Sequence, residues 1–180
     1  MHYPINTCIV MGAELGSMGD PINIIHNGRL VRLCCEGCID TLNEDPKKVM
    51  ADLDAAIVDA QLDSYPLDTC VISGAKLGSM GKPINVFHEN RLAQLCCAGC
   101  LDAFNADPAA AMSKVDTAYA NAQRDTYRLD TCIVSGAKLG SMGKPIELVA
   151  GTHLVRFCCA GCLPKFKAEP QKYLSILSQD

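Results

Sequence analysis

The run Leu33-Cys34-Cys35-Glu36-Gly37-Cys38 returns twice with small changes, as Leu95-Cys96-Cys97-Ala98-Gly99-Cys100 and Phe157-Cys158-Cys159-Ala160-Gly161-Cys162. In each copy an apolar, strand-like run ends in two adjacent cysteines, and a third cysteine follows one helical turn later. A lone cysteine precedes each copy at the same distance: Cys8, Cys70 and Cys132. The twelve cysteines therefore fall into three sets of four, with none left over.

The cysteine spacing defines an internal repeat of 62 residues without insertions, and such self-similarity indicates tandem structural units. A glycine-punctuated segment, Leu-Gly-Ser-Met-Gly, also recurs unchanged, whereas the segments that follow the cysteines have diverged. We therefore predict three domains: repeat 1 over 1–62, repeat 2 over 63–124 and repeat 3 over 125–180.

Within the first repeat, 22–25 and 30–33 are predicted to be short strands. Asn27-Gly28 lies between them, and Asn-Gly is a strong signal for a hairpin turn; the corresponding Glu89-Asn90 and Ala150-Gly151 are weaker signals. Gly37-Cys38 is expected to open a helix that reaches about residue 43.

A second helix should follow in each repeat and link it to the next. Asp45-Pro46 and Asp107-Pro108 have the form of an N-cap followed by proline at the first helical position, and Glu169-Pro170 leads a shorter helix. The predicted fold class is α+β, with three small treble-clef-like fingers, each a β-hairpin plus helix, joined by helical linkers.

Composition narrows the function classes. The net charge of −4 has both signs interspersed, without the basic stripe of a nucleic-acid-binding protein. No apolar run approaches the length of a membrane span, and the chain enters the first repeat at once, so no signal peptide is expected. Aromatic residues are only 5% of the chain. Units with such small cores usually need a metal or disulfides.

The segment 155–166, followed by Glu169-Pro170 and Tyr173, resembles a TRASH or YHS domain. The resemblance implies a treble-clef-like finger associated with heavy-metal trafficking, resistance and sensing. It covers nearly all of each repeat except the linker helix. The trios that match its motif are Cys8, Cys34 and Cys38; Cys70, Cys96 and Cys100; and Cys132, Cys158 and Cys162.

The sequence departs from that family at two positions. Zinc-binding relatives often carry a second cysteine three residues after the first, where this chain has Met11, Ser73 and Ser135. Relatives often have serine where this chain has Cys35, Cys97 and Cys159. These three cysteines are therefore candidates for the fourth ligand in each repeat.

Thiolates are soft ligands that suit Zn²⁺, Cu(I) and iron–sulfur clusters. Four per site permit the closed tetrahedron of structural zinc, whereas three suit Cu(I) better. We expect Zn²⁺ or Cu⁺, about one per repeat, and a helix N-terminus at Cys38 that lowers its thiol pKa. Met18, Met80 and Met142 are possible auxiliary thioether ligands, although flexible filling of a small core is the favoured interpretation. His26, His88 and His153 are interpreted as exposed hairpin residues.

Two other uses of the cysteines remain open. Their even number permits a disulfide framework, in which Cys8 pairs with Cys34, Cys35 or Cys38. Cys35-Glu36-Gly37-Cys38 also has the spacing of a thiol–disulfide redox motif, but a thioredoxin-like enzyme requires a βαβ context that the sequence lacks.

No other catalytic constellation is found, so we expect a binding protein and not an enzyme. The expected function is storage, buffering, trafficking or resistance for a heavy metal, with a metal transporter as a possible partner. The alternative is a scaffold protein stapled by metal or disulfides. Repeats beginning Tyr-Pro-Leu-Asp-Thr-Cys resemble domains of bacterial envelope proteins, which favours the periplasm or secretion over the cytoplasm.

Overall fold

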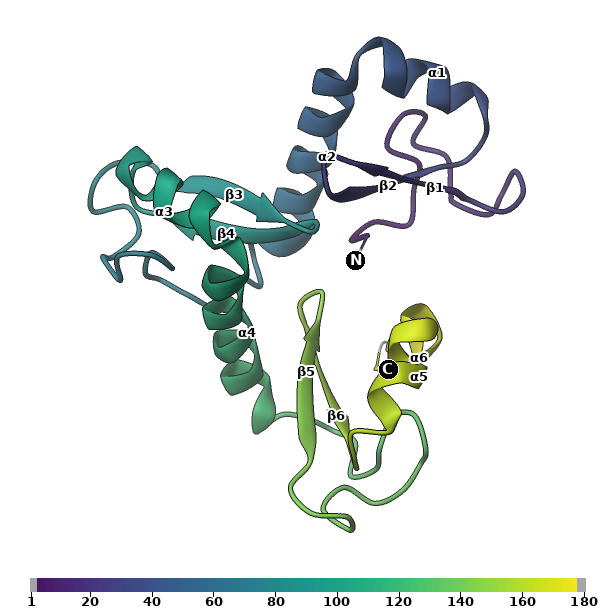
Figure 1. Cartoon of the computed structure of the whole chain (residues 1–180), viewed down its shortest axis with the longest axis vertical. Helices are drawn as coiled ribbons and strands as arrows, with labels where there is room; N and C mark the ends of the chain where they lie inside the picture. Colours follow the sequence, from purple (N-terminus) through teal and green to yellow (C-terminus); the bar gives the residue numbers. More distant parts are fainter. Residues whose placement is uncertain (1–2, 178–180) are drawn as a thin grey trace. The chain divides into compact units, whose positions relative to one another are not determined.

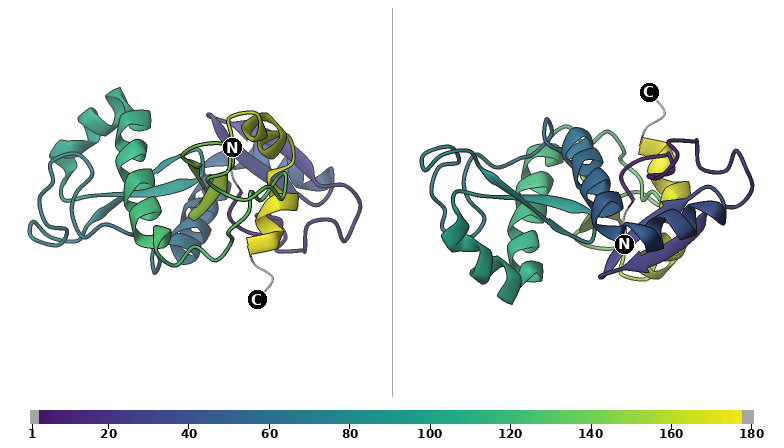
Figure 2. Two further views of the ribbon diagram at one scale, coloured as in Figure 1. Left: turned by 90° about the horizontal axis from the view of Figure 1, so that it is seen from below. Right: turned by 90° about the horizontal axis from the view of Figure 1, so that it is seen from above.

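A computed structural model describes residues 3–177, which form β-hairpins and helices in the order that the repeat predicts (Figure 1; Figure 2 gives two further views). The described strands are β1 (Ile22–His26), β2 (Arg29–Leu33), β3 (Ile84–His88), β4 (Arg91–Leu95), β5 (Ile146–Ala150) and β6 (His153–Phe157). The described helices are α1 (Gly37–Glu44), α2 (Pro46–Gln61), the short 3₁₀ turn η1 (Ala98–Cys100), α3 (Leu101–Ala106), α4 (Pro108–Arg124), α5 (Cys162–Ala168) and α6 (Pro170–Leu177). The α+β fold class is thus confirmed.

Each hairpin consists of two antiparallel strands joined by a two-residue turn. In β1–β2 the register pairs Ile22 with Leu33 and ends at His26 opposite Arg29. Both turn residues have positive φ, 48° at Asn27 and 75° at Gly28, as an Asn-Gly turn requires. Glu89 and Asn90, the weaker sequence signal, adopt the same left-handed conformation at φ 49° and 64°.

The linker helices begin where the Asp-Pro pairs predict. The Asp45 side chain accepts a hydrogen bond from the Lys48 backbone at 3.0 Å, and Asp107 caps α4 through the Ala110 backbone at 2.9 Å. These bonds satisfy amides that the first turn of a helix leaves unpaired. Helix α2 then buries Val49, Leu53 and Ile57 along one side.

By its internal contacts the chain divides into two compact units, one ending at Val115 and the other beginning at Asp116, so the division falls within α4. In the first unit, Leu92 of β4 packs into the core that the first repeat builds with β2, α1 and α2. In the second unit, a separate core forms around Phe157 and Phe166. The boundaries predicted at 62/63 and 124/125 stay predictions.

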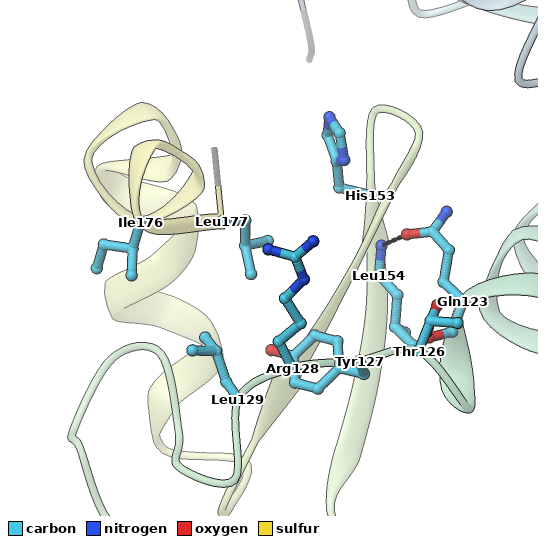
Figure 3. A pocket seen from close by; sticks show the side chains of 9 residues that line it. All are labelled: Gln123, Thr126, Tyr127, Arg128, Leu129, His153, Leu154, Ile176 and Leu177. Carbon is cyan, nitrogen blue, oxygen red and sulfur yellow. Dashed lines mark hydrogen bonds between the residues drawn. The ribbon is translucent and has the colours of Figure 1, made fainter. Parts of the chain in front are cut away.

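A glutamine near the end of each long linker helix holds the hairpin that follows it. The Gln61 side chain donates to the Asn90 carbonyl and accepts from the Leu92 amide, both at 2.9 Å. Gln123 repeats the arrangement and donates to the Thr152 carbonyl at 2.7 Å. It also accepts a hydrogen bond from the Leu154 amide at 2.8 Å (Figure 3). One side chain thus satisfies both main-chain groups at the turn.

Within residues 3–177, none of the helices is both long enough and apolar enough to cross a membrane.

Candidate metal centre

In each repeat, three different elements bring cysteine thiols to one buried point. Cys8 lies in the loop before the hairpin, Cys34 directly follows β2, and Cys38 lies in the first turn of α1. The three side chains are at most 2% exposed. Their Sγ atoms lie within 4.8 Å of one another, as do those of the trios Cys70, Cys96 and Cys100, and Cys132, Cys158 and Cys162. These groups are the trios that the resemblance implies.

The sulfur separations match those of a metal-bound cluster. Cys38 Sγ lies 3.7 Å from Cys8 Sγ and 3.8 Å from Cys34 Sγ, and Cys100 Sγ lies 3.8 Å from Cys70 Sγ and 3.9 Å from Cys96 Sγ. Metal–sulfur bonds of about 2.3 Å place tetrahedral ligands about 3.8 Å apart and trigonal ligands about 4.0 Å apart. The spacing therefore accommodates either geometry.

The fourth cysteine of each set lies beside the trio and is only partly buried. In the first repeat, Cys35 Sγ is 3.7 Å from Cys38 Sγ and 4.0 Å from Cys34 Sγ. Cys97 and Cys159 lie similarly, 3.8 and 3.9 Å from the sulfurs of Cys96 and Cys158. All twelve cysteines fall within the described residues, and each is a free thiol there.

Hydrogen bonds around the lead cysteine of each trio lower its thiol pKa. Burial acts to raise the pKa of Cys8, but hydrogen bonds with the backbone of Met11, Cys34 and Val10 outweigh it and lower the pKa. In the same way, burial opposes ionisation of Cys70 and Cys132, yet serine and backbone hydrogen bonds lower the pKa of each to about 6. Metal ligation requires this anionic form.

The third cysteine behaves in the opposite way, so the expected lowering of the Cys38 pKa at a helix N-terminus is wrong. Burial, together with hydrogen bonds to Cys35 and Cys8, raises the Cys38 pKa. Burial and neighbouring thiols likewise raise the pKa of Cys100 and of Cys162 to about 12. Each trio thus combines a lead thiol whose pKa is lowered with a third thiol whose pKa is raised. Metal binding would require the third thiol to lose its proton.

Sequence reasoning identified Ser73 and Ser135 only as positions that lack a ligand. Their hydroxyl oxygens lie 3.3 Å from Cys96 Sγ and Cys158 Sγ, respectively. The signal that could have revealed them is their placement three residues after the lead cysteine, where members of the family that the sequence resembles often carry another cysteine.

The methionines and two of the three histidines do not lie as expected. Met18, Met80 and Met142 are 59%, 65% and 65% exposed, so their interpretation as core filling is wrong, while an auxiliary ligand role stays a prediction. His153 is exposed, whereas His26 and His88 are partly buried. Each potential metal group found among the described residues is made of cysteines alone.

Two pockets lie near these features. One is lined by Ile5, Thr7, Cys8, Ile9, Gly12, Ala56, Asp59 and Ala60, and so reaches the lead cysteine of the first repeat. The other lies in the second unit, among side chains that include Arg128, His153 and Ile176 (Figure 3). The first pocket is the one that borders a thiol cluster.

Comparison with known proteins yields no matching family model, no matching curated protein and no matching solved structure. The likeness to TRASH and YHS domains therefore rests on the sequence motifs alone. Fold and site together define a cysteine-rich protein with three clusters of three cysteines, each positioned to hold one metal ion.

Proposed function

We propose that this protein binds one Zn²⁺ or Cu⁺ ion in each repeat and stores, buffers or delivers the metal, as in heavy-metal trafficking or resistance. Its residues bind a cation and do not turn over a substrate.

The observation that carries the proposal is the threefold recurrence of a buried trio of thiols. Contact between sulfur atoms alone produces similar separations, so distance is not the decisive feature. In each trio, hydrogen bonds with the loop backbone also stabilise the lead thiolate against the effect of burial. Buried charge is costly unless it is compensated, and a soft cation compensates it.

The partly buried fourth thiol favours a metal that is exchanged. Cys35 contacts two members of its trio at 3.7 and 4.0 Å and remains partly accessible. A thiol in that position can take up an incoming ion and pass it inward, or present it to the thiol of a partner. In a closed structural site the same thiol would be the fourth ligand, so it is the partial exposure of Cys35 and not its position that favours exchange.

The alternative is a metal that serves only to hold each repeat together. It has support from the cores: Cys8, Cys34 and Cys38 are themselves members of the hydrophobic cluster of the first repeat. For a structural site, removal of metal should unfold the repeat. For a cargo site, the metal should exchange while the hairpin and helices persist.

A redox enzyme has less support. A thioredoxin-like site would need a βαβ unit around Cys35 and Cys38, whereas across the described residues each sheet is a two-stranded antiparallel hairpin.

The test is native mass spectrometry of anaerobically purified protein, with elemental analysis and a count of free thiols after denaturation. The expected result is about three metal ions per chain and twelve free thiols. An unmetallated protein with paired cysteines, which also takes up no added Zn²⁺ or Cu⁺ after reduction, would overturn the proposal. Far-UV circular dichroism after chelation then separates cargo from structural metal.

A further inference from the structure

Two serine hydroxyls lie against the thiol clusters of the second and third repeats, where the first repeat carries a methionine. Ser73 Oγ is 3.3 Å from Cys96 Sγ, and Ser135 Oγ is 3.3 Å from Cys158 Sγ. Met11 occupies the equivalent position, and its side chain is 62% exposed. The three clusters therefore differ in one polar contact.

The backbone around this position is the same in all three repeats. The lead cysteine amide donates to the carbonyl five residues on, at 2.7 Å for Cys8, 2.8 Å for Cys70 and 2.7 Å for Cys132. The glycine that follows the variable position has φ of 69°, 73° and 71°. The difference between the repeats thus resides in the side chain.

Each serine hydroxyl also accepts a hydrogen bond from a backbone amide. The Ala75 amide donates to Ser73 Oγ at 3.3 Å, and the Ala137 amide donates to Ser135 Oγ at the same distance. A hydroxyl has one proton and two lone pairs. With a neutral cysteine either the hydroxyl or the thiol can donate. A thiolate has no proton, so once the cysteine is ionised the hydroxyl is the donor.

A donor at this point matters because of the charge of the site. Three thiolates around a monovalent or divalent cation leave a net negative charge, which is costly to bury without hydrogen bonds. Hydrogen bonds to an ionised acceptor are stronger than neutral ones. Removing such a partner of a metal ligand typically lowers metal affinity by about 10–100-fold.

We propose that Ser73 and Ser135 donate hydrogen bonds to metal-bound thiolates, so that repeats 2 and 3 form a matched pair of tight sites and repeat 1 is the weaker, exchanging site. This inference rests on the proposed function and assigns different roles to its three sites. A pocket lined in part by Cys8 lies beside this first site.

The experiment measures Zn²⁺ occupancy in each repeat of the full chain. Reduced, metal-free protein receives zero to four equivalents of Zn²⁺ under anaerobic conditions, followed by a short pulse of a thiol-alkylating reagent. Mass spectrometry of the cysteine peptides then reports the protection of each repeat. With up to two equivalents, the thiols of repeats 2 and 3 should be protected while those of repeat 1 react.

Four variants test the hydroxyl itself. Ser73→Ala should lower the affinity of the second site by about tenfold or more, and Ser73→Thr, which keeps the hydroxyl, should restore it. Met11→Ser should raise the affinity of the first site. Ser79→Ala is the matched control, because it removes a hydroxyl of the same repeat that is bonded to the Lys76 carbonyl at 2.7 Å.

The outcomes separate the two proposals. If no cysteine is protected at saturating Zn²⁺ and none at saturating Cu⁺, the proposed function fails and this inference fails with it. If all three repeats are protected but fill together, or the first repeat fills first, only the inference fails. It also fails if Ser73→Ala and Ser79→Ala have equal effects.

Discussion

The side-chain amide of Asn90 donates a hydrogen bond to the carbonyl oxygen of Leu30 at 2.6 Å, joining the hairpin turn of the second repeat to a strand of the first. Asn90 is fully buried, and its Oδ1 accepts a hydrogen bond from Arg29 Nε at 3.1 Å. Arg29 in turn pairs with Asp54 at 2.6 Å and lies over the Phe87 ring, 5.2 Å from its centroid. Within the first unit, these polar contacts complement the packing of Leu92.

Replacing Asn90 with glycine should loosen this junction. Glycine keeps the positive φ without strain, so the change removes the side-chain hydrogen bonds and takes the Asn90 donor away from the partly buried Leu30 carbonyl. We expect the first unit to lose about 1–3 kcal/mol of unfolding free energy, measured by chemical denaturation. Asn27→Gly is the control, since Asn27 is an exposed turn residue with φ of 48°. Equal losses in the two variants would contradict the prediction.

Replacing Gln123 with alanine should expose the turn of the third hairpin. The Gln123 side chain forms hydrogen bonds with the Thr152 carbonyl and the Leu154 amide. The methyl group of alanine can form neither bond. The Leu154 amide should exchange with deuterium about tenfold faster or more, corresponding to the loss of one or two hydrogen bonds. Gln61→Ala should do the same at Leu92 while leaving Leu154 protected; an unchanged rate at Leu154 in Gln123→Ala would refute the role.

Replacing one thiol should remove one site and spare the others. In Cys38→Ser the first trio loses a buried ligand, so native mass spectrometry should report about one metal fewer than in the unmodified protein. Loss of every metal would mean that the repeats share a cluster. Cys35→Ser should keep the full stoichiometry but release metal to a competing chelator at a different rate, because the partly buried thiol lies beside the trio.

Replacing His26 should leave metal affinity unchanged, because the metal-capable groups among the described residues consist of cysteines. Competition titration of His26→Asn with a chelator measures this affinity. A clear weakening at the first repeat would show that a histidine takes part in the site.

Acid should destabilise the second unit partly through Glu147. Its carboxylate accepts a hydrogen bond from Arg124, with Arg156 also close, and these contacts lower the Glu147 pKa. A carboxyl group whose pKa is lower in the folded state stabilises the fold above its unfolded-state pKa of about 4.3. That stabilisation disappears as the pH falls through the folded-state value. Glu147→Gln should cost less than about 1 kcal/mol at pH 7 and flatten the acid side of the stability profile; an unchanged profile would contradict this.

Local signals in the sequence were sufficient for most of the fold. The Asn27-Gly28 pair predicted a hairpin whose turn residues have positive φ, and the Asp45-Pro46 pair predicted the start of α2. Such signals act through atoms a few residues apart, so they do not depend on the rest of the fold. The 62-residue spacing carries the same assignments to the other repeats, except that the third turn is Gly151-Thr152 and not the predicted Ala150-Gly151, because Ala150 belongs to β5.

Side-chain environments were less predictable. Met18 was expected to fill the core and lies exposed, because its loop carries it away from the cluster of apolar residues. Cys38 was expected to have a lowered pKa, yet burial among other thiols has the larger effect. Both depend on which groups surround a side chain, and periodicity does not contain that information.

The sequence by itself determined the three repeats, their hairpins and helices, and the sets of cysteines from which any metal site must be built. Only the tertiary structure decided that three sulfurs of each set converge while the fourth stays partly accessible, that Ser73 and Ser135 touch the thiols, and that Asn90 is buried between two repeats. The physical reason is the sequence separation of the interacting residues. Turns and caps are determined by neighbouring residues, whereas the convergence of Cys8 with Cys34 and Cys38 depends on how a loop, a strand and a helix pack together.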